Sequence, residues 1–253
     1  MQHVKEQNWF AVGLDVIVVI VGIFLGMQVT NWNETRIENE TAKVYVERLK
    51  ADLLGNKKDM EERIVYFSTV RGYAQNALKA LNGPTENLDK EFVINIYQAR
   101  HILDRVLGRD TYDEILSVGA LNTESTMEVR KRLAVYYRSI GAQVANLDRI
   151  YPYRDIIRKT IPYDVQVLID ADCNDIITTE PNGEPSIMLP ATCDVDIPQP
   201  LVDESIEEIL GSNIKPELIQ RLTHLNSILG SMRLIIKRIG LLDNDLTQWK
   251  EAI

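Results

Sequence analysis

The chain has 253 residues, a mass of 28.9 kDa and a net charge of −9, from 28 Lys and Arg against 37 Asp and Glu. A hydrophobic fraction of 45% with 26% charged residues is ordinary for a folded chain and argues against wholesale disorder. The acidic balance argues against a nucleic-acid partner, because nucleic-acid binding needs a basic surface that displaces the counterions of phosphate.

The first predicted element is a transmembrane signal anchor at residues 10–30, after a short cytoplasmic tail at residues 1–9. Asp15 is the only charged residue in the span, and 21 helical residues reach across roughly 31 Å, the thickness of a hydrocarbon core. Trp9 and Trp32 flank the span, where indoles favour the headgroup region of the lipid bilayer. A buried core helix would show amphipathic periodicity, and a cleaved signal peptide would have a shorter apolar run followed by a small-residue cleavage site.

Three residues of the anchor fall on one face of the predicted helix: Asp15, Gly22 and Gly26. Glycines four residues apart let two helices approach closely, and an acid inside a membrane is costly unless it faces protein or water. We therefore expect transmembrane association through this face. The alternative is a chance glycine pair, with Asp15 reaching from one turn inside to the interface.

The orientation of the anchor is not decided by charge bias alone. Lys5 lies before the span, whereas Arg36, Lys43, Arg48 and Lys50 lie soon after it, which by the positive-inside rule does not favour export of the C-terminal part. A short N-terminal tail and two cysteines placed for a disulfide favour export. We expect a bacterial inner-membrane protein with a cytoplasmic N-terminus and a periplasmic C-terminal domain.

Residues 31–163 are predicted to form a stalk helix and a helical bundle. Apolar residues recur at three- and four-residue steps from Ala42 to Leu81, and Gly83-Pro84 ends this pattern. Further helices are expected at residues 85–107, at 110–122 with a turn at Gly119, and at about 124–161, with Pro152 and Pro162 as candidate kinks or interruptions. A C-terminal bundle helix is expected at residues 215–253. The predicted fold class is all-α, with an N-terminal transmembrane helix followed by an extramembrane antiparallel helical bundle.

Residues 164–214 form an acidic, proline-rich insert. The chain has no Lys or Arg between Thr160 and Ile214, but twelve acids, and five of its nine prolines lie between Asp164 and Pro200. A small hairpin is expected from Val165–Val167 and Ser186–Leu189. The run at 170–175 resembles the start of a calcium loop but lacks the required glycine, so a solvated acidic loop or a docking surface for a basic partner is preferred.

Cys173 and Cys193 are the only cysteines and both lie in this insert. Their spacing fits neither a redox CxxC pair nor a zinc site, which leaves a structural disulfide closing an irregular loop, or two reduced thiols. The disulfide is the expectation if the domain is exported.

No motif predicts catalysis. His3, His101 and His224 are scattered, and the chain has neither a GxSxG motif nor a glycine-rich phosphate loop. We expect no enzyme activity, no cofactor and no metal site.

The anchor resembles an uncharacterised bacterial family of single-pass membrane proteins. The resemblance rests on Gly13-x-Asp15, on Val21-Gly22-Ile23, and on Gln28 followed by Asn31-Trp32-Asn33-Glu34. A weaker match is the stretch from Asp110 to Gly119, a Tyr-x-x-Ile segment leading to a Ser-x-Gly turn. Since the family has no established activity, the resemblance implies location and a helical extracytoplasmic region. Asp15 stands where glutamate is common in the family, which keeps the acid but shortens its reach.

The function expected from these observations is a non-enzymatic protein that works by assembly, as a homo-oligomer or as an accessory subunit of a membrane complex. Its partners would be itself or other membrane proteins. Leu14-Asp15-Val16 at the start of the span is also similar to the ion-driven stator subunits of bacterial motors, in which the acid binds the translocated proton beside a multi-pass partner. A third possibility is an extracytoplasmic sensor that signals through a partner.

Overall fold

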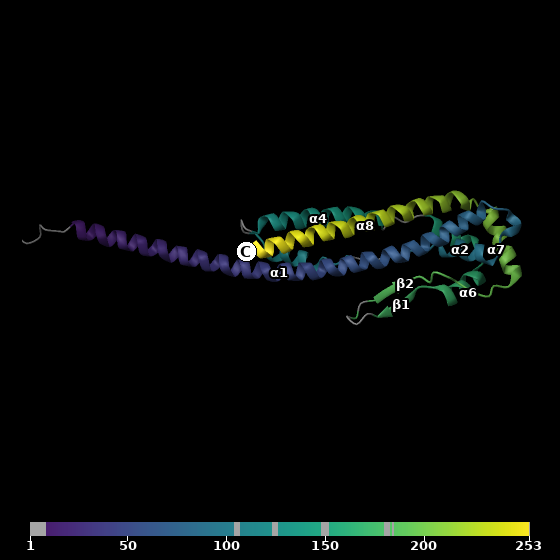
Figure 1. The fold of residues 1–253 in the computed structure, drawn as a ribbon, viewed down its shortest axis with the longest axis horizontal. Helices are drawn as coiled ribbons and strands as arrows, with labels where there is room; N and C mark the ends of the chain where they lie inside the picture. Colours follow the sequence, from purple (N-terminus) through teal and green to yellow (C-terminus); the bar gives the residue numbers. More distant parts are fainter. Residues whose placement is uncertain are drawn as a thin grey trace, which may run out of the picture.

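The computed structural model describes residues 9–103, 107–122, 126–147, 152–179, 183 and 185–252, and the side chains of these except 9–11, 142–147 and 252. Its dominant element is the helix α1, which runs unbroken from Trp9 to Leu81. At 1.5 Å per residue these 73 residues extend over roughly 110 Å. The N-terminal part of α1 projects beyond the other described elements (Figure 1). The predicted anchor and stalk are therefore one continuous helix.

The two halves of α1 have different surroundings. No described side chain between residues 12 and 41 is buried, and this part contains a segment long and apolar enough to cross a membrane. From Ala42 onward, buried apolar residues recur at three- and four-residue steps, as the sequence predicts. The apolar side chains of the first half have no protein cover, whereas those of the second half form the core.

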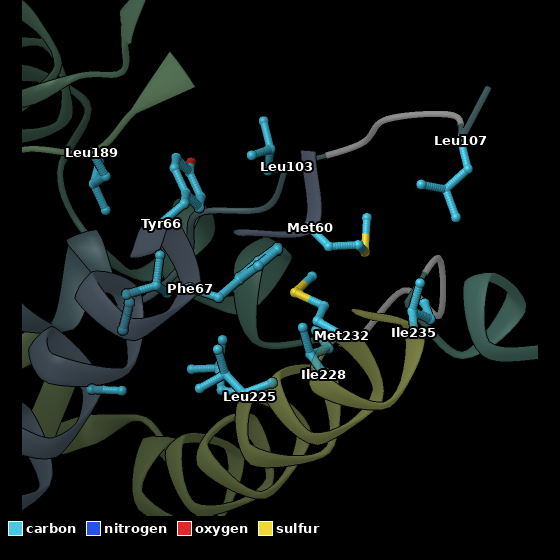
Figure 2. Packing of buried hydrophobic residues seen from close by; sticks show 14 of the residues in the cluster. Met60, Tyr66, Phe67, Leu103, Leu107, Leu189, Leu225, Ile228, Met232 and Ile235 are labelled. Atoms are coloured by element: carbon cyan, nitrogen blue, oxygen red, sulfur yellow. The ribbon is translucent and has the colours of Figure 1, made fainter. Parts of the chain in front are cut away.

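The second long helix, α8 (Ile214–Ala252), supplies the other side of the core. Met60 and Phe67 of α1 lie opposite Leu225, Ile228 and Met232 of α8 (Figure 2), and all five are buried. Polar pairs flank this seam: Glu47 with Lys250, Lys50 with Asp243 at 3.7 Å, and Arg71 with Asn226 at 3.3 Å. These pairs connect α1 and α8 at three places along the two helices.

A short helix, α2 (Lys90–Gln98), follows a single turn of 3-10 helix at Thr85–Asn87 and is buried on all sides. Asp89 caps it by accepting a hydrogen bond from the amide of Phe92 at 3.2 Å. Every residue from Phe92 to Gln98 is buried. The expected helix at 85–107 is wrong in length, because α2 ends at Gln98 and the chain from His101 to Leu103 is not helical.

The middle of the chain follows the predicted pattern with one interruption. Helix α3 (Asp110–Val118) ends at Gly119, whose φ of 69° is the left-handed conformation that glycine tolerates. Helix α4 (Met127–Leu147) packs against α8, and α5 (Tyr153–Thr160) follows Pro152. Two described helices thus lie within 124–161, where one was expected with possible interruption by prolines.

The acidic insert is more ordered than the expected irregular loop. It contains the helices α6 (Tyr163–Cys173) and α7 (Gln199–Gly211) and an antiparallel hairpin of β1 (Ile176–Thr179) and β2 (Pro185–Met188), in which Ile177 pairs with Ile187. The expected first strand, Val165–Val167, is instead part of α6. The all-α description therefore omits a small two-stranded sheet, although the molecule is mostly helical.

The predicted disulfide between Cys173 and Cys193 is confirmed, with the two Cα atoms 5.5 Å apart. It joins the end of α6 to the segment after β2. Leu189, which lies between β2 and Cys193, is buried beside Tyr66 and Phe67 of α1 (Figure 2). The hairpin is thus held at its base by a covalent bond and by packing on α1.

Candidate functional site

The predicted association face lies on the uncovered half of α1. Gly22 and Gly26 are exposed, and a Cβ built on either would meet no atom within 4 Å. Asp15 is exposed on the same helix, and Trp32 is 68% exposed. Trp9 begins α1, but its side chain lies outside the described residues. Nothing in the described part of the chain covers this face.

The anchor face has a counterpart on the folded half of the same helix. On an ideal α-helix, Asp15, Gly22, Gly26, Val44 and Ala51 fall within a sector of about 40°. Val44 is 59% exposed and Ala51 is also exposed. The core residues of this part of α1 point to the opposite side: Ala42, Val46, Leu49 and Leu53. One side of α1 is therefore open both in its apolar segment and in the start of the folded part.

A second arrangement, which the sequence reasoning missed, is a polar cluster centred on Tyr66 and His101. Tyr66 donates a hydrogen bond to Asp175 at 2.9 Å, and its hydroxyl lies 3.3 Å from Nδ1 of His101. Tyr66 and His101 are buried at 1% and 6% exposure. The cluster joins α1, the end of α2 and the start of the hairpin.

Arginines complete the cluster. Arg100 bridges Asp170 of α6 and the imidazole of His101, and its guanidinium lies 3.6 Å from the ring centroid of Tyr97. Arg221 of α8 donates to the carbonyls of Ala99 and His101. These carbonyls follow the last turn of α2, so a buried cation satisfies acceptors for which the helix has no partner.

The protonation states in the cluster follow from burial. Burial, with the neighbouring Arg100 next, lowers the pKa of His101 to about 3, so the imidazole is neutral near pH 7. Burial also lowers the pKa of Arg221 to about 10 and raises the pKa of Asp175, while the hydrogen bond from Tyr66 opposes the rise at Asp175. A histidine with so low a pKa is a poor general base at neutral pH. The cluster is therefore better explained as a structural connection than as a site of acid–base chemistry. It connects α1, the end of α2, the segment from α6 to β1, and α8.

The acids of the cluster lie in the run at 170–175, which the sequence suggested to be a solvated loop. Asp170 and Asp175 are instead hydrogen-bonded to Tyr97 and Tyr66. The sequence did contain a signal for this cluster. Acids are concentrated around Cys173, and the basic residues Arg100 and His101 come soon after the apolar segment that forms α2. In the described ranges, no group of three His, Cys, Asp or Glu side chains is arranged to hold a metal ion.

A third feature is a groove between α4 and α8. It has a volume of about 400 Å³, and its apolar lining residues are Val135, Leu241 and Leu242. Charged side chains also line it, and Arg132 contacts both Glu128 and Asp245. This combination can accommodate a small amphipathic molecule.

Comparison with known proteins adds no identification. No protein-family model, no curated protein and no solved structure matches the chain. Function must therefore be argued from the sites described above.

Proposed function

We propose that this chain is a non-enzymatic, single-pass protein of a bacterial inner membrane that acts by assembly, as a homo-oligomer or as an accessory subunit of a membrane complex. In this proposal the N-terminus is cytoplasmic, and the part after the anchor is a periplasmic antiparallel helical bundle. The protein would belong to the family of single-pass membrane proteins that its anchor resembles. The observation that carries the proposal is the open side of α1, which bears Asp15, Gly22 and Gly26 in the apolar segment and continues into the folded part.

Three physical arguments support this proposal. An acid and two glycines on one face of an apolar helix favour contact with another helix, because the acid avoids lipid there and the glycines allow close backbone approach. The disulfide between Cys173 and Cys193 favours an oxidising compartment. The pairing of Glu47 with Lys250 and of Arg71 with Asn226 favours an antiparallel bundle.

The association face is tested with matched glycine variants. Gly22→Leu combined with Gly26→Leu adds bulk on the face and should reduce association of the full chain in membranes, measured by energy transfer between labelled copies. Gly13→Leu is the control, since Gly13 lies roughly opposite the face on an ideal helix and its Cβ also meets no atom within 4 Å. Unchanged energy transfer in the double variant would refute this face as a contact between copies of the chain.

A stator-like role with a multi-pass partner is the alternative, favoured by the exposed carboxyl of Asp15 within the apolar segment. Asp15→Asn separates the two functions. Asparagine still forms hydrogen bonds, so an assembly role should largely survive the change. Proton transport needs a titratable group and should be lost.

A further inference from the structure

The α4–α8 groove has the composition of a small-molecule site. Its volume of about 400 Å³ lies in the range of ligand pockets, which are mostly apolar with a few polar groups. A second hollow of about 260 Å³ adjoins it and shares Glu128, Arg132, Leu242 and Asp245. Since Trp249 and Leu246 line the second hollow, the apolar surface continues along α8 toward its C-terminal end.

The groove carries a net positive charge in a chain of net charge −9. Its two acids, Glu128 and Asp245, both contact Arg132, at 3.3 Å and 2.5 Å. Lys131 and Arg238 also line the groove, and neither forms an ion pair with another described residue. The groove therefore offers two cations that have no ion-pair partner among the described residues, beside an apolar lining.

Two buried polar atoms at the groove also lack a partner among the described residues. The hydroxyl of Tyr136 and Nη1 of Arg238 are buried without a hydrogen bond, and the side chain of Tyr136 is 5% exposed. A buried polar group without a partner costs free energy. Arg238 thus brings to the groove a charge that has no ion pair among the described residues, while its Nη1 is closed to solvent.

We propose that this groove binds a free amphiphile with one anionic head group, of the fatty-acid type, with its head at Arg238 and Lys131 and its tail along Val135, Leu241 and Leu242. The ligand is a dissolved monomer and not a bilayer lipid. Lys50 of α1 forms an ion pair with Asp243, which follows the groove residue Leu242 in α8. Lys50 lies about 30 Å beyond Thr30 along α1, so the groove lies well away from the end of the proposed membrane span. Neither the proposed assembly nor the anchor face is needed for this binding.

The test uses the full chain in lipid nanodiscs and measures the rate at which a maleimide alkylates a cysteine placed in the groove. Leu241→Cys is suitable because Leu241 is 58% exposed and the two native cysteines are joined to each other. The probe is octanoate. Ten times its Kd should slow alkylation about tenfold, because the rate follows the unoccupied fraction. Leu210→Cys, exposed on α7 outside the groove, should show no protection.

Two comparisons define the outcome. Adding Arg238→Gln to the Leu241→Cys chain should remove protection by octanoate, whereas Arg233→Gln, an exposed change outside the groove, should leave it intact. Octanol, which has the same tail and no charge, should not protect. The proposal is overturned if octanoate gives no protection, if octanol protects equally, or if Arg238→Gln has no effect.

Discussion

At the scale of single residues, the polar cluster around Tyr66 connects segments that are far apart in the sequence. Tyr66 lies on α1, while Asp175 lies between α6 and β1, and their hydrogen bond of 2.9 Å spans 109 positions of sequence. A buried donor or acceptor that loses its partner costs more than the hydrogen bond itself contributes. The hydroxyl of Tyr66 should therefore contribute more to the free energy of unfolding than the hydroxyl of an exposed tyrosine does.

Tyr66→Phe should lower the free energy of unfolding by about 1–3 kcal/mol, because the half-buried carboxyl of Asp175 then loses its donor. Tyr163→Phe is the matched control, since Tyr163 is 76% exposed and its change should be within about 0.5 kcal/mol. Urea unfolding followed by circular dichroism measures both. Equal stability of the two variants would contradict the role given to Tyr66.

His101 makes a prediction about pH. Its pKa is about 3 in the folded chain and 6.5 in the unfolded chain, so between these values the unfolded state binds the extra proton. The charged and polar neighbours are Tyr66, Gln98, Arg100, Arg154, Asp175 and Arg221. The free energy of unfolding should therefore fall as pH drops below 6.5, by up to about 1.4 kcal/mol per pH unit from this group.

The measurement is unfolding at pH 6.5 and pH 5.0 for the wild-type chain and for His101→Gln. The variant should be less stable at pH 6.5 but should lose less stability on acidification, since glutamine takes up no proton. His224, also buried, is present in both chains and its effect cancels in the comparison. An equal loss of stability in both chains would show that His101 does not carry the pH dependence.

At the scale of elements, no residue of the hairpin strands β1 and β2 is buried. All four residues of β1 are exposed, and a two-stranded sheet is marginal when alone. Its attachments are the disulfide at its base, the packing of Leu189 on α1, and the hydrogen bond from Gln98 to the carbonyl of Cys173 at 2.7 Å. The disulfide should thus matter for the hairpin more than for the long helices.

Replacing both Cys173 and Cys193 by serine should cost about 3 kcal/mol, as expected when a loop of this length is no longer closed in the unfolded chain. Amide exchange should accelerate most in β1 and β2 and least in α8. A reductant should destabilise the wild-type chain and leave the double variant unchanged. Wild-type stability in the double variant would contradict a structural role for the disulfide.

The elements that the sequence predicted best were those with a local signal. The helical periodicity of α1 and α8, the turn at Gly119 and the pairing of Cys173 with Cys193 need only neighbouring residues or the only two cysteines. The end of α2 at Gln98 was not predictable, because the carbonyls after it are satisfied by Arg221, more than a hundred residues away. The polar cluster escaped notice for the same reason, since its members come from four distant segments.

The first strand of the hairpin was predicted in the wrong place, because a short segment fits two periodicities. Val165 and Val167 alternate with polar residues, as in a strand, yet they lie in α6, where Val165 and Ile169 are buried four residues apart. A short segment fits both periods, and packing against the rest of the molecule decides between them.

At the scale of the whole molecule, the most important feature is that one helix belongs to two environments. The first part of α1 exposes its apolar side chains, and the second part supplies the core of the folded region. A helix of this kind transmits the position of the anchor directly to the folded part, because no flexible linker separates them in the described residues. Association at the anchor face would therefore bring the open side of the stalk, including Val44 and Ala51, close to a neighbour.

The most direct test of assembly is native mass spectrometry of the full-length protein, extracted from its membrane in mild detergent. Our account predicts a species of two or more copies, at an integer multiple above 28.9 kDa, or a stable complex with another membrane protein. A stoichiometric multi-pass partner would favour the stator-like function of Asp15 over a purely structural one. A single species at 28.9 kDa, with no partner, would contradict the claim that this protein acts by assembly.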